Sequence, residues 1–217
     1  MTKTNTTSVL LFFATTAFLT ASSASAKGRD ISIAPTLGFG SCISDGVSDV
    51  MGHTIGLEFQ SESQSNGPYI PDMHYLLTWP LYKYFDLYSF DLLWGEFRCP
   101  INDLGHVKLK ITGGLAAQWG NKYRLSPEMS FIWKFGVGAY GSRVSEGKTD
   151  GTTYVPIIAP TIASGLQYRH TDHLFTWLGA RYMHLLASEK IPAKDTTNKK
   201  RIDGGLLTLY LQTGYIF

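Results

Sequence analysis

The chain has 217 residues, of which 44% are hydrophobic, 13% are aromatic and only 17% are charged. That charged fraction is below the quarter or so that is usual for soluble domains, and the formal net charge of +2 argues against a nucleic-acid partner. No apolar run approaches the ~18 residues that a membrane-spanning helix requires, so a helical membrane protein is excluded.

Residues 1–26 have the features of a secretory signal peptide. Lys3 supplies positive charge, and residues 9–19 (VLLFFATTAFL) form an apolar core too short to anchor the chain in a membrane. Ala24-Ser25-Ala26 offers a small-x-small cleavage pattern. We therefore predict export, with one mature domain over residues 27–217 in a compartment where disulfides can form.

The mature chain alternates apolar and polar side chains with a period of two, which is the pattern of a β-strand. In residues 107–119, Leu109, Leu115 and Trp119 fall on one face, and Lys108 and Lys110 fall on the other. Similar alternation extends over residues 31–40, 53–60, 86–97, 129–140, 154–169, 174–186 and 204–217. The sequence thus predicts eight strands, most of them near the ~10 residues that a tilted strand needs to cross a bilayer.

Alternation does not reveal which face of a barrel is inside. A soluble barrel such as a lipocalin buries its apolar face, whereas a membrane barrel turns that face toward lipid. Here the apolar faces carry aromatic residues toward the strand ends, as interfacial girdles do (Trp119, Trp133, Tyr215 and Phe217), and the opposite faces carry charges in mid-strand. We therefore predict an all-β fold, a monomeric eight-stranded antiparallel transmembrane β-barrel with a filled polar interior.

The interior of an eight-stranded barrel is filled by its own side chains. We expect the inward charges to form a salt-bridge network that plugs the lumen, with Glu58, Asp91, Lys108, Lys110, Lys134, Arg169 and Arg181 as its members. The alternative is an anion-selective pore, which would need a wider barrel.

The C-terminus carries the most specific pattern in the chain. Counting back from Phe217, the alternate residues are Tyr215, Thr213, Leu211, Leu209 and Leu207. This ending resembles the C-terminal signal of bacterial outer-membrane barrels, a terminal Phe preceded by aromatic or apolar residues at alternate positions. The resemblance covers about the last ten residues. It implies a Gram-negative outer-membrane location, insertion by the barrel-assembly machinery, and contact with outer-membrane lipids and lipopolysaccharide.

With both termini periplasmic, residues 41–52, 98–106, 141–153 and 187–202 become outer loops, and residues 169–173 become a short periplasmic turn. Residues 61–85 do not fit, because a short turn belongs there. We interpret their aromatic-rich part as an interfacial segment or as extra strand length.

Cys42 and Cys99 fall at the outer ends of the first and third strands. A bridge between them would close a loop of nearly 60 residues and contribute about 4 kcal/mol in the chain-entropy model. Two unpaired thiols are the alternative.

Two prolines, Pro156 and Pro160, interrupt the predicted sixth strand, where neither can donate to the ladder. This strand, with residues 131–153 before it, resembles the corresponding part of the lipid A palmitoyltransferases. In that family, prolines open lateral gaps that admit acyl chains to the barrel. The family also uses an outer-loop His with an Asp-Ser pair. Residues 98–106 contain no such pair, and His53 and His106 match no motif of the family.

His184, Ser188 and Asp203 could all face outer-leaflet lipid near the rim. This arrangement is similar to the lipid A 3-O-deacylases, which use an external His and Ser on the penultimate strand with an acidic partner. That family places Ser two residues after His, where this chain has Leu186. Four residues along a strand span about 13 Å, so only a bulge at Ala187 could bring His184 and Ser188 into contact.

No phosphate-binding glycine loop, zinc pattern or nucleotide motif is found, so no cofactor or metal is predicted. The first functional hypothesis is a non-enzymatic outer-membrane protein that acts in envelope integrity or surface interaction, through its outer loops and through contact with lipopolysaccharide. The second is a lipid A acyl-modifying enzyme, either a transferase or a deacylase.

Overall fold

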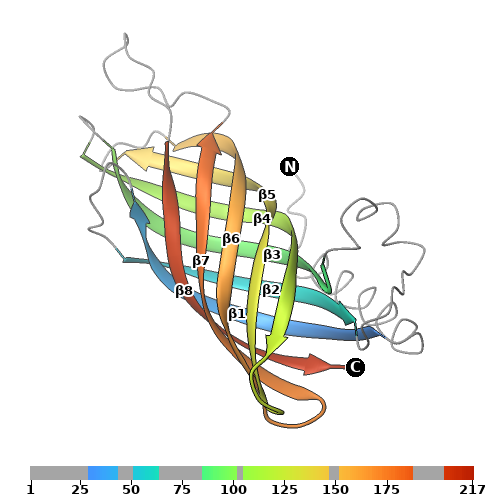
Figure 1. The fold of residues 1–217 in the computed structure, drawn as a ribbon. Coiled ribbons are helices and arrows are strands. Elements are labelled where there is room, and N and C mark those ends of the chain that lie inside the picture. The colour runs from blue at the N-terminus through green and yellow to red at the C-terminus, as the bar shows by residue number, and fades with distance from the viewer. Residues whose placement is uncertain (1–28, 44–50, 64–84, 102–104, 147–151, 188–202) are drawn as a thin grey trace, which may run out of the picture.

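The computed structural model describes residues 29–43, 51–63, 85–101, 105–146, 152–187 and 203–217. These residues form β1 (Arg29–Ile43), β2 (Met51–Ser63), β3 (Leu87–Ile101), β4 (Gly105–Arg124), β5 (Met129–Glu146), β6 (Thr152–Arg169), β7 (Leu174–Ala187) and β8 (Asp203–Ile216). Each strand pairs antiparallel with the next, and β8 pairs with β1, so the sheet closes into a barrel (Figure 1). The predicted eight-stranded antiparallel barrel is confirmed.

Within these described ranges, no helix is long and apolar enough to cross a membrane. The predicted signal peptide, residues 1–26, lies outside the described residues.

The strands extend further toward the outer end of the barrel than the apolar pattern predicted. β4 begins at Gly105 and β5 continues to Glu146. The ranges left between strands at this end are residues 44–50, 102–104, 147–151 and 188–202. The ladder joins backbone groups, so pairing does not stop where the side chains cease to be apolar. Parts of the predicted outer-loop ranges therefore belong to strands.

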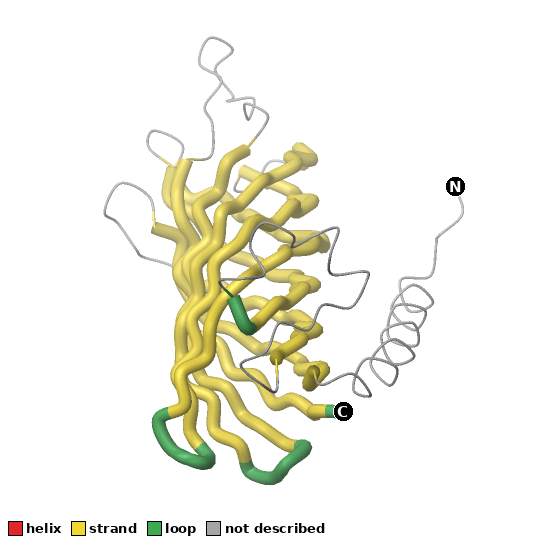
Figure 2. The backbone as a smooth tube through the Cα atoms, turned by 45° about the vertical axis from the view of Figure 1, so that its right-hand side comes forward, coloured by secondary structure: helices red, strands yellow, loops and turns green. Residues whose placement is uncertain are grey.

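At the inner end, two short turns at residues 125–128 and 170–173 lie at the same end of the barrel as the C-terminus (Figure 2). In one turn the Ser126 hydroxyl accepts a hydrogen bond from the Met129 N–H at 3.0 Å, and in the other the Thr171 hydroxyl accepts one from the Leu174 N–H at 3.0 Å. Residues 61–63 extend β2, whereas residues 64–84 lie outside the described residues. An interfacial role for residues 61–85 stays a prediction.

Large apolar side chains cover the outside of the barrel. The strand register sets one outward apolar row across β2 to β7, in which Ala139 is the one small side chain: Leu57, Leu92, Leu115, Ala139, Ile158 and Leu186. Leu178 on β7 and Leu209 on β8 are 62% and 66% exposed, whereas Lys134 is fully buried in the lumen. A soluble barrel has the reverse arrangement. The apolar face is thus the face that meets hydrocarbon.

Aromatic side chains gather outside the barrel toward its inner end. The Phe135 ring lies 5.1 Å from Phe85 and 5.8 Å from Trp133 between centroids. Beside the C-terminus, the Tyr215 and Phe217 rings meet edge to face at 5.2 Å, and the Phe217 N–H donates to the Ile31 carbonyl at 2.9 Å. This is the distribution of an interfacial girdle.

The lumen is filled in three layers. An outer apolar layer includes Phe97, Leu109 and Leu185, and an inner apolar layer includes Phe175 and Trp177. The buried charged side chains lie between the two, in the middle of the barrel. The interior is filled as predicted, but its polar groups are concentrated in one layer.

A β-bulge on β4 changes which of its side chains face the lumen. Leu115 pairs with Leu92 of β3 but Ile111 pairs with Gly95, so β4 has one extra residue between these pairs. The same extra residue appears opposite β5. Gly113 has a φ of 152°, a conformation that side chains rarely adopt, and the Thr112 hydroxyl donates to the Gly141 carbonyl at 3.0 Å.

The bulge overturns part of the predicted lumen set. Because one inserted residue reverses the alternation, Leu109 and Ile111 point into the lumen, and Lys108 and Lys110 are exposed on the outside. The prediction that both lysines line the lumen is therefore wrong. β4 alternates on both sides of the bulge, but the predicted face assignment holds only from Leu115 toward Arg124.

Candidate functional site

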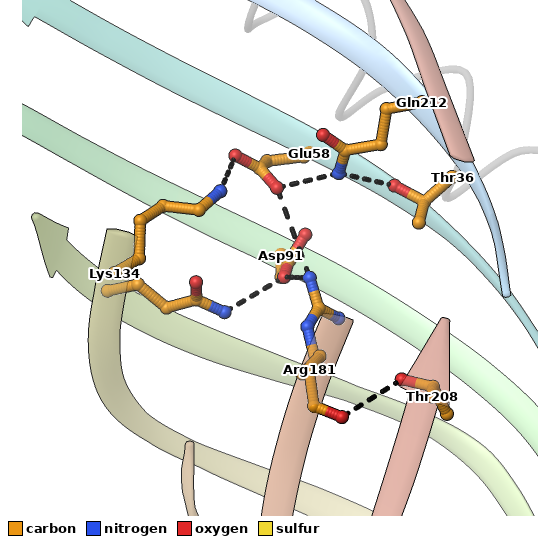
Figure 3. A network of polar contacts seen from close by, with 8 residues as sticks. Thr36, Glu58, Asp91, Lys134, Arg181, Thr208 and Gln212 are labelled. Atoms are coloured by element: carbon orange, nitrogen blue, oxygen red, sulfur yellow. Dashed lines mark hydrogen bonds and ion pairs between the residues drawn. The ribbon is translucent and has the colours of Figure 1, made fainter. Parts of the chain in front are cut away.

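Two acidic and two basic side chains meet in the middle of the lumen (Figure 3). Glu58 on β2 forms an ion pair with Lys134 on β5, and Asp91 on β3 forms one with Arg181 on β7. Arg181 also lies 4.0 Å from Glu58, which joins the two pairs into one cluster. All four side chains are at most 3% exposed. We call these four residues the lumen cluster.

Amides from two further strands add hydrogen bonds to both carboxylates of the lumen cluster. The Gln118 amide of β4 donates to Asp91 at 2.9 Å. The Gln212 amide of β8 donates to Glu58 at 2.7 Å and to the Thr36 hydroxyl of β1 at 2.8 Å. The carboxylates thus receive polar donors from several walls of the barrel, as buried charges require.

Aromatic rings cover the cations of the lumen cluster. Lys134 Nζ lies 3.8 Å from the centre of the Trp177 ring, and the Arg181 guanidinium carbon lies 5.0 Å from that of Tyr210. Such cation–π contacts stabilise desolvated cations. Two carboxylates and two cations cancel in formal charge, and their contacts cross the lumen from β2 to β5 and from β3 to β7.

Four of the seven predicted lumen charges therefore come together, and three do not. Lys108 and Lys110 lie outside the barrel because of the bulge. Arg169 lies at the inner end of β6, 3.6 Å from the Asp30 carboxylate, and both side chains are partly exposed. Its position at a strand end, where water reaches it, separates it from the lumen cluster.

Cys42 and Cys99 form a disulfide, with 5.1 Å between their Cα atoms. Both lie in strands rather than in outer loops, and both are buried in the outer apolar layer. β2 begins at Met51, which pairs with Ser41 of β1. Cys42 therefore lies past the outer end of β2 and has no β2 residue opposite it. The bridge therefore joins β1 directly to β3 across the outer end of β2.

Pro156 and Pro160 both face outward on β6, which pairs with β5 through both positions. Toward β7 the ladder is interrupted. Ile158 pairs with Leu186 and Thr161 with Met183, but in the described part of this seam Ala159 and Pro160 have no paired residue. Proline lacks the N–H that a ladder bond needs at this position.

His184 faces outward on β7, and its Nδ1 lies 3.3 Å from the Tyr182 hydroxyl. In the register, His184 lies opposite Gly205, and Asp203 lies opposite Leu186. Ser188 falls outside the described residues, so a His184–Ser188–Asp203 arrangement stays a prediction. Of the two rim histidines, His53 is exposed on β2 opposite Glu96, and the side chain of His106 is not among those described.

Four basic side chains are exposed outside the barrel at the outer ends of β3, β4 and β5: Arg98, Lys108, Lys110 and Arg143. We call them the basic rim. Nothing in the apolar pattern singles out Arg98 and Arg143, and strict alternation places the two lysines in the lumen. Gly113-Gly114 in the middle of a strand was the available signal, since paired glycines there often mark a bulge.

Neither a protein-family model nor a curated protein matches the chain. Among solved structures, the Neisserial surface protein A aligns with a TM-score of 0.51 and 12% identity, over 88% of this chain and 97% of that one. The attachment invasion locus protein Ail of Yersinia pestis aligns with a TM-score of 0.50 and 13% identity, over 88% of this chain and 99% of that one. The chain shares the fold of these small outer-membrane barrels.

Proposed function

We propose that this chain, which has the fold of small bacterial outer-membrane barrels, resides in the outer membrane as a non-enzymatic protein. It acts in envelope integrity or surface interaction, through its outer segments and through contact with lipopolysaccharide. The observation that carries this proposal is the lumen cluster, a charge-neutral group that links opposite walls of the barrel between two apolar layers.

A lumen closed in this way favours function at the outer surface over passage through the barrel. Moving an ion through the middle would require breaking two buried ion pairs whose partners have no water to replace them. The segments that join strands at the outer end, together with the lipid-facing exterior, are then the parts of the protein available to other molecules.

The test has an electrical arm and a cellular arm. In planar bilayers we expect the purified protein to show no steady conductance, and in cells we expect its deletion to increase sensitivity to bile salts and large apolar antibiotics. Replacing residues 187–202 by Asn-Gly makes a minimal hairpin turn between the paired Leu186 and Asp203. If the protein acts through its outer surface, this variant should behave like the deletion; if it acts as a barrier, the variant should behave like the wild type. Ion-selective channels from the wild-type protein would contradict the proposal.

The interrupted β6–β7 seam favours a second candidate function, lipid A acyl modification. The interruption at Ala159 and Pro160 lies near the middle of β6, and the lumen toward the outer end from it is lined by apolar side chains such as Ile157 and Leu185. An apolar interior next to a weakened seam suits an acyl chain, although side chains fill it in this conformation.

Mass spectrometry of lipid A from cells with and without the protein decides between the two candidates. The non-enzymatic proposal predicts an identical acylation pattern in both. A gained or lost acyl chain that depends on the protein would instead support the enzyme, and the variant Pro160→Val, which restores the missing donor, would then be expected to reduce that change.

A further inference from the structure

The basic rim forms a compact group on the lipid-facing side of the sheet. Arg98 pairs directly with Lys108, and Lys110 pairs directly with Arg143. Like charges that face each other across a ladder destabilise a sheet. Glu96 is the one acid among these positions, and its carboxylate lies 2.7 Å from Lys108 Nζ. Among the described side chains, the rim therefore keeps an excess of positive charge, with four cations to one acid.

The basic rim begins where the apolar exterior ends. On β3 the outward residues run Leu92, Trp94, Glu96 and Arg98 toward the outer end, from apolar through aromatic to charged. Trp94 lies against Gly113 at the bulge, so an indole sits directly below the cationic pairs. Tryptophan favours the boundary between hydrocarbon and headgroups, which places that boundary just below the rim.

The length of β4 also places the boundary between hydrocarbon and headgroups just below the basic rim. From Tyr123, exposed at its inner end, to Lys110, the strand rises by roughly 30 Å along the barrel axis at a tilt near 40°. The apolar band of such barrels is about 25 Å tall. With Tyr123 at the inner interface, Lys110 lies a few ångströms beyond the outer edge of the band, at the height of lipid headgroups.

The bulge is what brings the two lysines to this surface. With strict alternation Lys108 and Lys110 would point into the lumen, where Leu109 and Ile111 lie instead. Gly113 adopts its unusual φ to insert the extra residue. The same irregularity thus supplies apolar packing inside the barrel and cations outside it.

We propose that the basic rim binds the phosphate groups of an anionic outer-leaflet glycolipid, lipid A, whose acyl chains lie along the outward row below it. A phosphate between facing cations removes their repulsion and accepts charge-assisted hydrogen bonds. The apolar row that includes Leu92, Leu115 and Ala139 runs below the level of Trp94, which suits a ligand with both a charged head and acyl chains. The inference deepens the proposed function, since it names the lipopolysaccharide contact on which that function rests.

The experiment uses the full mature protein in neutral detergent micelles, with titration calorimetry of lipid A bearing both phosphates. The test variants are K110Q/R143Q and R98Q/K108Q, and the control is R124Q, which removes a cation exposed at the other end of β4. Altered mobility of unheated protein on gels verifies that each variant is folded. We expect each double variant to bind at least about tenfold more weakly and R124Q to bind like the wild type.

Three further probes identify the source of the phosphate. Fully dephosphorylated lipid A should bind like the double variants, and inorganic phosphate or a sulfated polysaccharide should bind far more weakly than lipid A. Equal binding by the double variants and the wild type would overturn the inference. So would equal affinity for dephosphorylated lipid A, for inorganic phosphate or for the polysaccharide.

Binding to purified protein is independent of any cellular phenotype. A protein that binds lipid A through the rim while its deletion leaves the envelope unchanged would refute the proposed function and leave this inference standing. If deletion of the protein weakens the envelope but the purified protein does not bind lipid A, this inference is refuted and the proposed envelope function stands.

Discussion

Removing one charge from the lumen cluster should cost far more stability than removing a complete pair. Lys134→Met leaves the Glu58 carboxylate with Gln212 at 2.7 Å and Arg181 at 4.0 Å as its remaining partners, in a site that is 1% exposed. Breaking a buried pair in this way costs about 3–5 kcal/mol, because the remaining charge has lost its hydration and its partner.

The double variant Glu58→Leu with Lys134→Met should restore much of that loss. It leaves Asp91 and Arg181 as a neutral pair and fills the site with apolar volume, a replacement that is often neutral or better. The summed losses of unfolding free energy in the two single variants should therefore exceed the loss in the double variant by about 2 kcal/mol or more, which is the coupling energy of the pair.

Urea unfolding of the barrel in lipid vesicles measures these free energies, with tryptophan fluorescence as the signal. Trp177, whose ring lies 3.8 Å from Lys134 Nζ, reports directly on the site. Arg169→Met, at the partly exposed pair with Asp30, is the matched control and should change stability by less than about 1 kcal/mol. Additive losses, or a loss from Lys134→Met no larger than that of the control, would refute this account of the cluster.

Three other predictions follow from the disulfide, the bulge and the C-terminus. In the unreduced protein a thiol reagent should modify neither cysteine, and Cys42→Ala with Cys99→Ala should lower the free energy of unfolding by about 4 kcal/mol, since the bridge spans 57 residues; labelling of both would contradict the bridge. Gly113→Val should lower the free energy of unfolding by on the order of 1–3 kcal/mol in the same urea assay, because valine disfavours a φ of 152°. Gly141→Val, at a position without a positive φ, measures the cost of added side-chain volume alone; an equal loss from both variants would contradict the role of the φ. Phe217→Ala should lower the folded amount in the outer membrane much more than it lowers stability in vesicles, as expected of an assembly signal on a half-buried residue just after β8; equal losses in both measurements would assign Phe217 a purely structural role.

The number of strands and the side that faces lipid could be read from the sequence because both depend on a local pattern. Alternate side chains of a strand point to opposite faces whatever the strand pairs with. That rule puts Glu58 and Lys134 on the faces opposite the apolar side chains of their strands. The aromatic residues toward the strand ends and the charges in mid-strand then indicated which face meets lipid. The aromatic ending at Tyr215 and Phe217 is likewise a property of a few consecutive residues.

The membership of the lumen cluster and of the basic rim was decided by tertiary structure. Asp91 meets Arg181 from a distance of ninety residues because barrel closure sets their strands across one narrow lumen, and no local pattern encodes that distance. One inserted residue at Gly113 then reverses every side chain beyond it, and it is stable only because β3 and β5 hold their registers on either side. Alternation is a property of one strand, whereas register belongs to the strands that pair, and this is why the sequence placed Lys108 and Lys110 on the wrong side of the wall.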